Sequence, residues 1–260
     1  MNSINIQEIC DIAVEAGKQI LAIYTSKDFG VENKADDSPL TLADRASHLK
    51  IVEGLEQLDQ QYPILSEEGD PGDFELRKAW KTFWCVDPLD GTKEFIKRNG
   101  EFTVNIALID GNFPVLGVIY VPVTDTLYYA SAGKAFKKTK EGTVQLQVSS
   151  NADKMVAVGS RSHSSEEEKQ VLELFGIEEV ASRGSSLKFC MVAEGKATVY
   201  YRRNPTMEWD TAAGQAIVEA SGGAVLNKAN TRFNYNKTSL RNDSFLCLGA
   251  KTTDLPWNKI

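Results

Sequence analysis

A short apolar run that ends in two carboxylates constrains this chain more than any other feature. Residues 83–86 predict a buried strand, and the segment 87–92, Asp-Pro-Leu-Asp-Gly-Thr, follows at once. Proline interrupts a central strand and Asp-Gly-Thr is typical of a turn into a helix, so we expect the strand to end before the proline and a helix to begin near the threonine. A surface Asx turn with a helix cap would explain the same pattern. Alternatively, Asp87 and Asp90 can both face a hard divalent cation.

Two more acidic sites follow the same plan. Glu67 and Glu68 come directly after a short apolar stretch, and Asp210 begins an alanine-rich segment, 210–221, that we predict to be a helix. A helix cap alone would account for Asp210. Three acidic sites placed at the ends of apolar segments nevertheless favour a shared metal centre.

The predicted ligands are Glu67, Asp87, Asp90, Asp210 and the carbonyl of Leu89. Such a set could hold two divalent ions about 4 Å apart, the arrangement that clamps the attacking and leaving oxygens at phosphorus. The predicted reaction is metal-assisted hydrolysis of a phosphomonoester. Backbone N–H groups at the start of the predicted helix would face the phosphate.

Two threonines and one aspartate are candidates for moving a proton. Thr41 and Asp44 lie one helical turn apart, so they either cap a helix or orient a water molecule. Thr92 is likewise either a first-turn residue or a hydroxyl that relays a proton.

Other reaction classes fit the sequence less well. An aspartyl-phosphate mechanism of the haloacid dehalogenase kind needs an aspartate two residues before Asp90, where this chain has Pro88. A non-enzymatic ion-binding module of the EF-hand type would need a loop that the sequence lacks. His48 and His163 are far apart and lack the spacing of a zinc hydrolase.

Composition sets the broad class. The chain has 260 residues, of which 42% are hydrophobic and 25% charged, as in a globular protein with a substantial core. A net charge of -7 argues against binding to nucleic acid or anionic lipid. Residues 3–25 have the periodicity of an amphipathic helix rather than that of a signal peptide or membrane span. The four cysteines lack C-x-x-C pairing and predict buried free thiols in a reducing compartment.

The pattern changes near residue 150. We predict an α+β subdomain over residues 1–150, with helices over a largely antiparallel sheet and a hairpin turn at 110–112. Strands and helices alternate after that point, which predicts an α/β subdomain over 151–260 that completes the site.

With these sites in hand, the chain resembles the inositol monophosphatase superfamily over nearly its whole length. The matching motifs are Glu67-Glu68, the segment 87–92 and the segment 209–214, Trp-Asp-Thr-Ala-Ala-Gly, in the family's order and spacing. Segments 36–44, 93–96 and 184–190 are more similar to its branch of CysQ-type 3'(2'),5'-bisphosphate nucleotidases. The resemblance implies a layered α-β-α-β-α sandwich of the inositol monophosphatase and fructose-1,6-bisphosphatase type.

The resemblance also implies roles for individual residues. Glu67, Asp87 and the Leu89 carbonyl would hold one Mg2+, and Asp87, Asp90 and Asp210 a second, with a weaker third ion near Glu67. The attacking water would lie near Thr92 and Asp44, and Glu68 would orient water or ligand. Gly91 and Thr92 would contact the phosphate through their backbone.

The implied substrate is adenosine 3',5'-bisphosphate, a by-product of sulfur metabolism, which would lose its 3'-phosphate to give AMP. Its sulfated analogue and sensitivity to lithium are implied in the same way, and inositol phosphates or sugar bisphosphates are alternative substrates. The expected location is the cytoplasm, with peripheral association with the inner membrane as an alternative; monomer and homodimer both stay open. Candidates for binding the rest of the substrate are Ser185, Lys188, Arg161, Arg202, Arg203, Ser160, Ser162 and His163.

Overall fold

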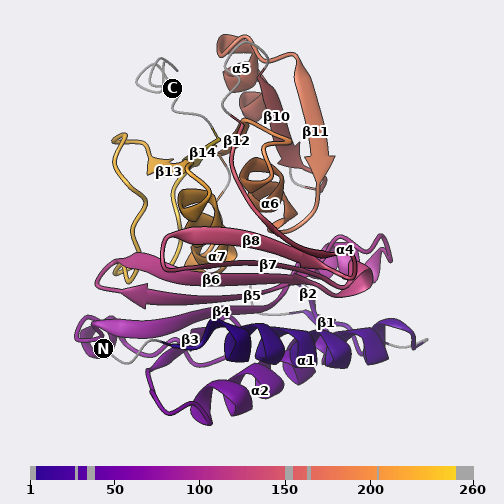
Figure 1. Cartoon of the computed structure of the whole chain (residues 1–260), viewed down its shortest axis with the longest axis vertical. Helices are drawn as coiled ribbons and strands as arrows, with labels where there is room; N and C mark the ends of the chain where they lie inside the picture. The colour runs from indigo at the N-terminus through magenta and orange to yellow at the C-terminus, as the bar shows by residue number, and fades with distance from the viewer. Residues whose placement is uncertain are drawn as a thin grey trace.

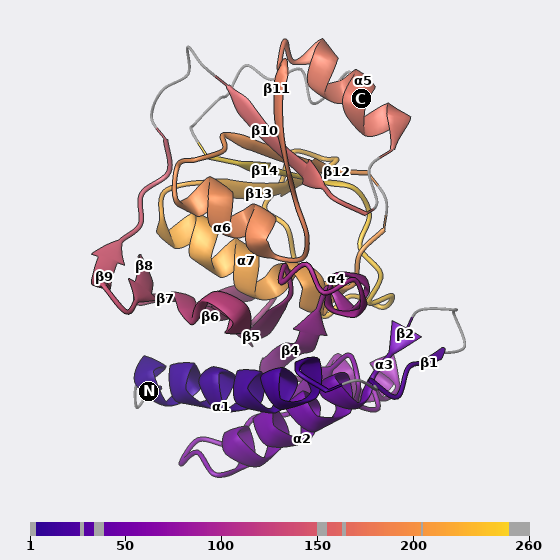
Figure 2. The same ribbon diagram turned by 90° about the vertical axis from the view of Figure 1, so that its right-hand side faces the viewer.

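The computed structural model describes residues 4–26, 29–33, 39–149, 155–162, 165–203 and 205–249. Its helices and sheets stack in alternating α-β-α-β-α layers, as Figures 1 and 2 show. The predicted layered architecture is therefore confirmed.

The first two layers come from the amino-terminal part of the chain. Helices α1 (Ile6–Tyr24) and α2 (Leu42–Glu56) lie against each other and cover one face of a seven-stranded sheet. The sheet follows chain order and is antiparallel except between its first two strands. Its strands are β3 (Ile64–Ser66), β4 (Thr82–Asp90), β5 (Thr103–Asp110), β6 (Phe113–Val121), β7 (Thr126–Ser131), β8 (Lys134–Thr139) and β9 (Gly142–Gln145).

The remaining layers come from the carboxy-terminal part. Helices α6 (Leu187–Ala193) and α7 (Glu208–Ala220) lie between the first sheet and a second, five-stranded sheet of order β11-β10-β12-β14-β13, and α5 (Glu166–Leu174) lies on its outer face. Its strands are β10 (Val156–Ser160), β11 (Glu179–Arg183), β12 (Val199–Arg202), β13 (Ala224–Asn227) and β14 (Phe245–Leu248). Shorter elements are β1 (Glu32–Asn33), β2 (Pro39–Leu40), α3 (Phe74–Arg77), α4 (Thr92–Ile96) and η1 (Pro122–Thr124).

Most predicted elements are present, including the long first helix and the hairpin turn between β5 and β6. Several short elements were not predicted, among them β1, β2, α3, η1 and β8. The change of sheet between β9 and β10 falls near the predicted boundary, and the division into two subdomains at residue 150 stays a prediction.

The prediction that the strand ends before Pro88 is wrong. β4 continues to Asp90, and its pairing with β5 shifts register between Asp87 and Asp90. A bulge of this kind tolerates a residue without an N–H, because the extra residue is left out of the ladder. The Pro88 carbonyl is used instead by α2, since the Ser47 hydroxyl donates to it at 2.6 Å.

Helix α7 fits between the layers because glycines stand where it approaches its neighbours. A Cβ on Gly117 of β6 would lie 2.7 Å from the Ala213 carbonyl oxygen, and a Cβ on Gly214 would lie 2.4 Å from the ring of Phe189 in α6. Larger side chains at either position would push α7 away from the sheet or from α6. The small residues after Asp210 therefore have a packing role.

All four cysteines fall within the described residues, and all are buried and free. Burial raises the pKa of the Cys10 thiol to about 12, so it is neutral at ordinary pH. This confirms the prediction of buried free thiols. None of the described helices is long and apolar enough to cross a membrane.

Candidate active site

The parallel pair β3 and β4 brings the first two carboxylates together. Ser66 pairs with Val86 in this ladder, and the N–H of Glu67 donates to the Val86 carbonyl at 3.1 Å. Glu67 and Asp87 are therefore the next residues along two neighbouring segments that run in the same direction, so they lie side by side just beyond the paired residues of β3. Parallel pairing of β3 and β4 thus explains why the carboxylates that follow these two apolar runs lie next to each other.

The bulge in β4 adds the third carboxylate to the same side. In a regular strand, residues three apart point to opposite faces. Asp87 pairs with Asn105 and Asp90 with Thr103, so three steps along β4 match two steps along β5. Because Asn105 and Thr103 share a face, Asp87 and Asp90 do so as well. The bulge therefore lets two aspartates that are three residues apart point to the same side of the sheet.

Asp210 reaches the site from α7. The helix begins at Glu208 with Met207 as its N-cap, so Asp210 lies in the first turn and is not the cap residue. Its Oδ2 accepts a hydrogen bond from the Met207 N–H at 2.8 Å. The carboxylate is thereby held at the helix start, where negative charge is favourable.

These carboxylates line one cavity of about 490 Å3. Its walls come from both parts of the chain. The predicted site residues that line it are Glu67, Asp87, Leu89, Asp90, Gly91, Thr92, Ser160, Ser185, Lys188, Arg202 and Asp210.

The carboxylates crowd one another. Burial raises the pKa of Asp87 well above the usual carboxyl range, and the charges of Glu67 and Asp90 raise it further. Burial and the same two neighbours raise the pKa of Asp210, while its hydrogen bond from Met207 lowers it. Negative charge at this edge is therefore destabilising unless a cation or protons neutralise it.

The donor set fits a hard divalent cation, although the carboxylates stand apart from one another in the metal-free chain. Within the described residues, no three acidic, histidine or cysteine side chains lie close enough together to hold a metal ion. Protein donors hold three of the carboxylates: Asp87 accepts from the Leu89 N–H at 3.1 Å, Asp90 from Ser186, and Asp210 from Met207. Four carboxylates around one cavity still match the oxygen ligands that Mg2+ prefers.

Asp44 and the two threonines form a connected group beside the cavity. Thr41 caps α2, and Asp44 accepts hydrogen bonds from the Thr41 backbone and hydroxyl, so the capping explanation is correct. Asp44 also lies 3.2 Å from the hydroxyl of Thr92, which lines the cavity. Burial raises the pKa of Asp44, and the hydrogen bonds from both threonines oppose this. The group therefore links a buried carboxyl to the cavity through a single hydroxyl.

Gly91 makes the turn into α4. Its φ of 93° lies in the left-handed region, and a Cβ there would lie 3.1 Å from Ser185 and from the Glu101 carbonyl. Helix α4 begins at Thr92 as predicted but has only five residues. Contact between the phosphate and the backbone of Gly91 and Thr92 stays a prediction.

Two buried cations lie in the wall supplied by α6 and β12. Lys188 and Arg202 are 6% and 8% exposed, and the Lys188 ammonium donates to the Ser185 carbonyl and lies 5.4 Å from the centre of the Tyr200 ring. Burial lowers the pKa of Lys188 to about 8; Arg202 also lowers it, whereas Asp90 raises it. Arg202 lies 3.8 Å from Glu168. A buried pair of cations suits a ligand with a second anionic group.

Several predicted residues lie outside the cavity lining, namely Thr41, Asp44, Glu68, Arg161, Ser162 and Arg203. Arg161 binds Glu101 with two hydrogen bonds, of 2.7 and 2.8 Å, and so joins β10 to the segment before β5. Glu68 acts electrostatically on Asp44 and His48. Asp44 lies behind Thr92. Roles for Arg161 and Glu68 in binding stay predictions, and His163 and residues 36–38 fall outside the described residues.

Other lining residues were not predicted from sequence. They include Tyr200, Trp209, Phe245, Thr206 and Arg241, which reach the cavity from β12, α7, β14 and connecting loops. Ser186 and Asn105, which contact Asp90, were also missed. Asn105 carried a signal, because a polar residue interrupts an otherwise apolar strand.

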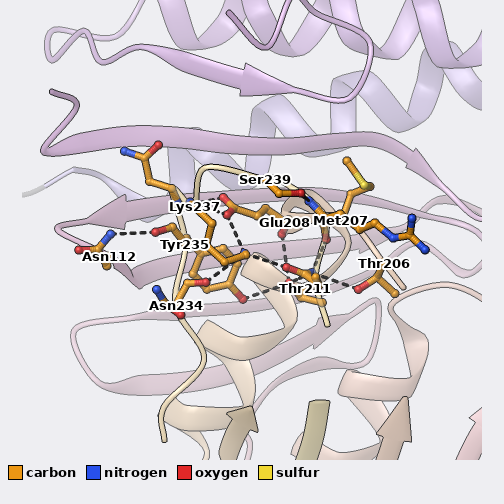
Figure 3. A network of polar contacts seen from close by, with 12 residues as sticks. Asn112, Thr206, Met207, Glu208, Thr211, Asn234, Tyr235, Lys237 and Ser239 are labelled. Atoms are coloured by element: carbon orange, nitrogen blue, oxygen red, sulfur yellow. Dashed lines mark hydrogen bonds and ion pairs between the residues drawn. The ribbon is translucent and has the colours of Figure 1, made fainter. Parts of the chain in front are cut away.

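A buried polar network fixes the start of α7 (Figure 3). Glu208 is fully buried, and its carboxylate accepts from the backbone N–H groups of Asn236 and Lys237 and from the Lys237 ammonium at 2.7 Å. Lys237 also donates to Asn242, whose amide donates to the Met207 carbonyl at 2.7 Å. The loop after β13 is thereby tied to the residues that lead into Asp210.

Comparison with known proteins identifies relatives of this chain. A sequence model of the inositol monophosphatase family matches residues 5–253. The 3'(2'),5'-bisphosphate nucleotidase CysQ of Salmonella typhimurium is 47% identical over 249 residues, which cover 95% of this chain and 99% of that protein. The protein of the same name from Escherichia coli is 50% identical over 221 residues, covering 85% and 89%.

Solved structures similar to this one come from the same family. The crystal structure of CysQ from Bacteroides thetaiotaomicron, described as a bacterial member of the inositol monophosphatase family, has a TM-score of 0.83 and 44% identity and covers 95% of this chain and 97% of that one. An inositol monophosphatase from Thermotoga maritima has a TM-score of 0.78 at 22% identity, with 94% and 91% covered, and supports the fold alone.

Removing one crowded charge should stabilise the metal-free protein. In the folded chain the pKa of Asp87 is raised, so its contribution to stability is greatest at low pH and is lost as the pH rises through the folded pKa. Asp87→Asn keeps the acceptor for the Leu89 N–H and removes the charge. In chelator at pH 7 we expect a gain on the order of 1 kcal/mol, or roughly 2–4 °C in Tm, by calorimetry. An unchanged or lower Tm would contradict the crowding.

Breaking the network of Figure 3 should be costly. Lys237→Met leaves the buried Glu208 charge with backbone donors only, and we expect a loss of about 3 kcal/mol in the free energy of unfolding, measured by urea titration. Arg45→Met is the matched control, because it breaks the exposed Arg45–Glu32 pair and should cost less than about 1 kcal/mol. Equal losses in the two variants would show that the buried pair has no special weight.

Proposed function

The chain belongs to the inositol monophosphatase family, and from this membership we propose that it is a 3'(2'),5'-bisphosphate nucleotidase that removes the 3'-phosphate of adenosine 3',5'-bisphosphate to give AMP. The family consists of metal-dependent phosphatases. The relatives that match over most of this chain at 44–50% identity carry the nucleotidase or CysQ name. The implied partner is a small nucleotide bisphosphate.

The charged groups that line the cavity support a substrate with two phosphates. The cavity has four carboxylates from β3, β4 and α7, and it also has two buried cations from α6 and β12. A substrate with one phosphoryl group needs the metal-binding carboxylates only. The buried Lys188 ammonium donates to the neutral Ser185 carbonyl, so a second phosphate on the substrate would supply a charged partner beside it and beside Arg202, which also faces Glu168.

We assign the metal to the crowded carboxylates. Glu67, Asp87, Asp90, Asp210 and the Leu89 carbonyl would hold Mg2+, in two sites and with a weaker third. When bound, such cations supply Lewis acidity and a water of lowered pKa. The carboxylates contribute by neutralising and positioning that charge at one edge of the sheet.

The chain's own groups do the remaining work. The Thr92 hydroxyl lies between the cavity and Asp44, so it can take a proton from a water in the cavity while donating its own to that buried carboxylate. Lys188 and Arg202 bind the second phosphate, and the buried rings of Tyr200 and Phe245 exclude water and contact the nucleoside.

The direct test compares two substrates in parallel. Phosphate release is measured from adenosine 3',5'-bisphosphate and from inositol 1-phosphate, with Mg2+ and again with excess chelator. We expect turnover that depends on Mg2+ and strongly favours the nucleotide. Preference for the inositol ester would move the protein to the sister branch with the same metal chemistry. Turnover that persists in chelator would contradict the metal assignment.

Lys188→Ala should separate the two phosphates. Loss of a charge-assisted contact of about 1.5–3 kcal/mol should lower kcat/KM for the bisphosphate roughly 10- to 100-fold, mainly through KM, with a smaller effect on a simple phosphomonoester. The matched control is Lys196→Ala, since this lysine is 59% exposed and pairs with Glu194. Equal effects on both substrates would remove Lys188 from the second-phosphate site.

A further inference from the structure

Asp90 is held by a chain of buried polar side chains. The Ser186 hydroxyl donates to Asp90 Oδ2 at 2.6 Å, and Asn105 Nδ2 lies 2.8 Å from the Ser186 oxygen and 3.3 Å from the same carboxylate oxygen. The Thr103 hydroxyl donates to Asn105 Oδ1 at 3.0 Å. Thr103, Asn105 and Ser186 are each at most 2% exposed.

The hydrogen bonds between these side chains all run in one direction, from Thr103 to Asp90. Because Thr103 occupies the oxygen of the Asn105 amide, the NH2 group faces Ser186 and Asp90. The Ser186 oxygen accepts from that NH2, and its single proton goes to the carboxylate, since the competing Asp210 carbonyl is farther away, at 3.3 Å. Hydrogen bonds arranged head to tail strengthen one another.

Ser186 donates to Asp90 instead of capping the helix at whose start it lies. It occupies the N-cap position of α6, where a serine side chain usually accepts a backbone N–H and contributes about 1 kcal/mol to the helix. Within the described residues, the Ser186 side chain makes no such capping bond. Departures of this kind from local preference concentrate at functional sites.

The row of hydrogen-bonded side chains also joins two layers of the fold. Asn105 and Thr103 stand opposite Asp87 and Asp90 in the β4–β5 ladder. Ser186 belongs to the turn that leads into α6, which supplies Lys188 to the cavity wall. The Asp90 carboxylate is thus oriented from the sheet and from the helix layer together.

We propose that Ser186 and Asn105 are positioning residues that hold the Asp90 carboxylate in the orientation in which it binds a divalent cation. This rests on the proposed function, because it takes Asp90 as a metal ligand. Both hydrogen bonds go to Oδ2, so they fix the rotation of the group and leave Oδ1 on its other side. A carboxylate oriented in advance loses less side-chain freedom on binding the ion.

The test measures cation binding rather than turnover. Mn2+, which takes the same oxygen ligands as Mg2+, is titrated calorimetrically into the full chain. We expect Ser186→Ala and Asn105→Ala each to raise the Kd for Mn2+ roughly tenfold or more. Ser186 and Asn105 belong to one hydrogen-bond network. The double variant should therefore raise Kd by less than the product of the two single effects.

Two variants separate positioning from general stability. Ser221→Ala removes another buried serine hydroxyl, one that donates to the Val218 carbonyl at 2.8 Å at the opposite end of α7 from Asp210, and should leave Kd unchanged. Ser186→Thr keeps the hydroxyl and should restore an affinity close to that of the unmodified protein. Thermal unfolding in chelator reports any loss of fold.

The outcomes are distinct. Mn2+ binding by Ser186→Ala and Asn105→Ala within about twofold of the unmodified protein would overturn the inference and leave the proposed function standing. A lowered Tm with unchanged Kd would assign these residues a structural role only, which also overturns it. If the unmodified protein binds no Mn2+, the metal assignment fails, and the inference fails with it.

Discussion

Repulsion between carboxylates at one buried edge is the constraint on which the rest of the structure depends. Glu67, Asp87, Asp90 and Asp210 line one cavity, and burial together with mutual repulsion raises the pKa of at least two of them. A marginally stable chain retains such a cluster only if the surrounding elements force it together. The ladders of the first sheet and the tightly packed α7 provide that force, and Asp87, Asp90 and Asp210 are each held by a backbone or side-chain donor.

Sequence reasoning worked where the information is local. Apolar periodicity predicted the long first helix and the strand at 83–86, and the carboxylates beside apolar segments, Glu67, Asp87, Asp90 and Asp210, do line one cavity. Proline chemistry alone misled the prediction at Pro88, because whether a strand can continue past a proline depends on the register of its partner.

Other features need the tertiary structure. Arg161 looked like a substrate contact, yet its guanidinium is committed to Glu101, which lies 60 residues earlier in the chain. Ser186 was not predicted as a site residue, and only the tertiary structure shows that its hydroxyl donates to Asp90. Local pattern gives the type of a residue and its element, whereas the partner of a long polar side chain is decided by packing between layers.

The close packing of α7 has a consequence for how the site can move. Gly117 and Gly214 bring this helix against β6 and Phe189 with no room for a methyl group, and Lys237 anchors its first residue. A helix confined on both faces and tied at its start cannot slide or tilt without breaking several contacts at once. Asp210 is therefore a fixed reference point in the cavity, and a change in the shape of the substrate has to be met by the other walls rather than by α7.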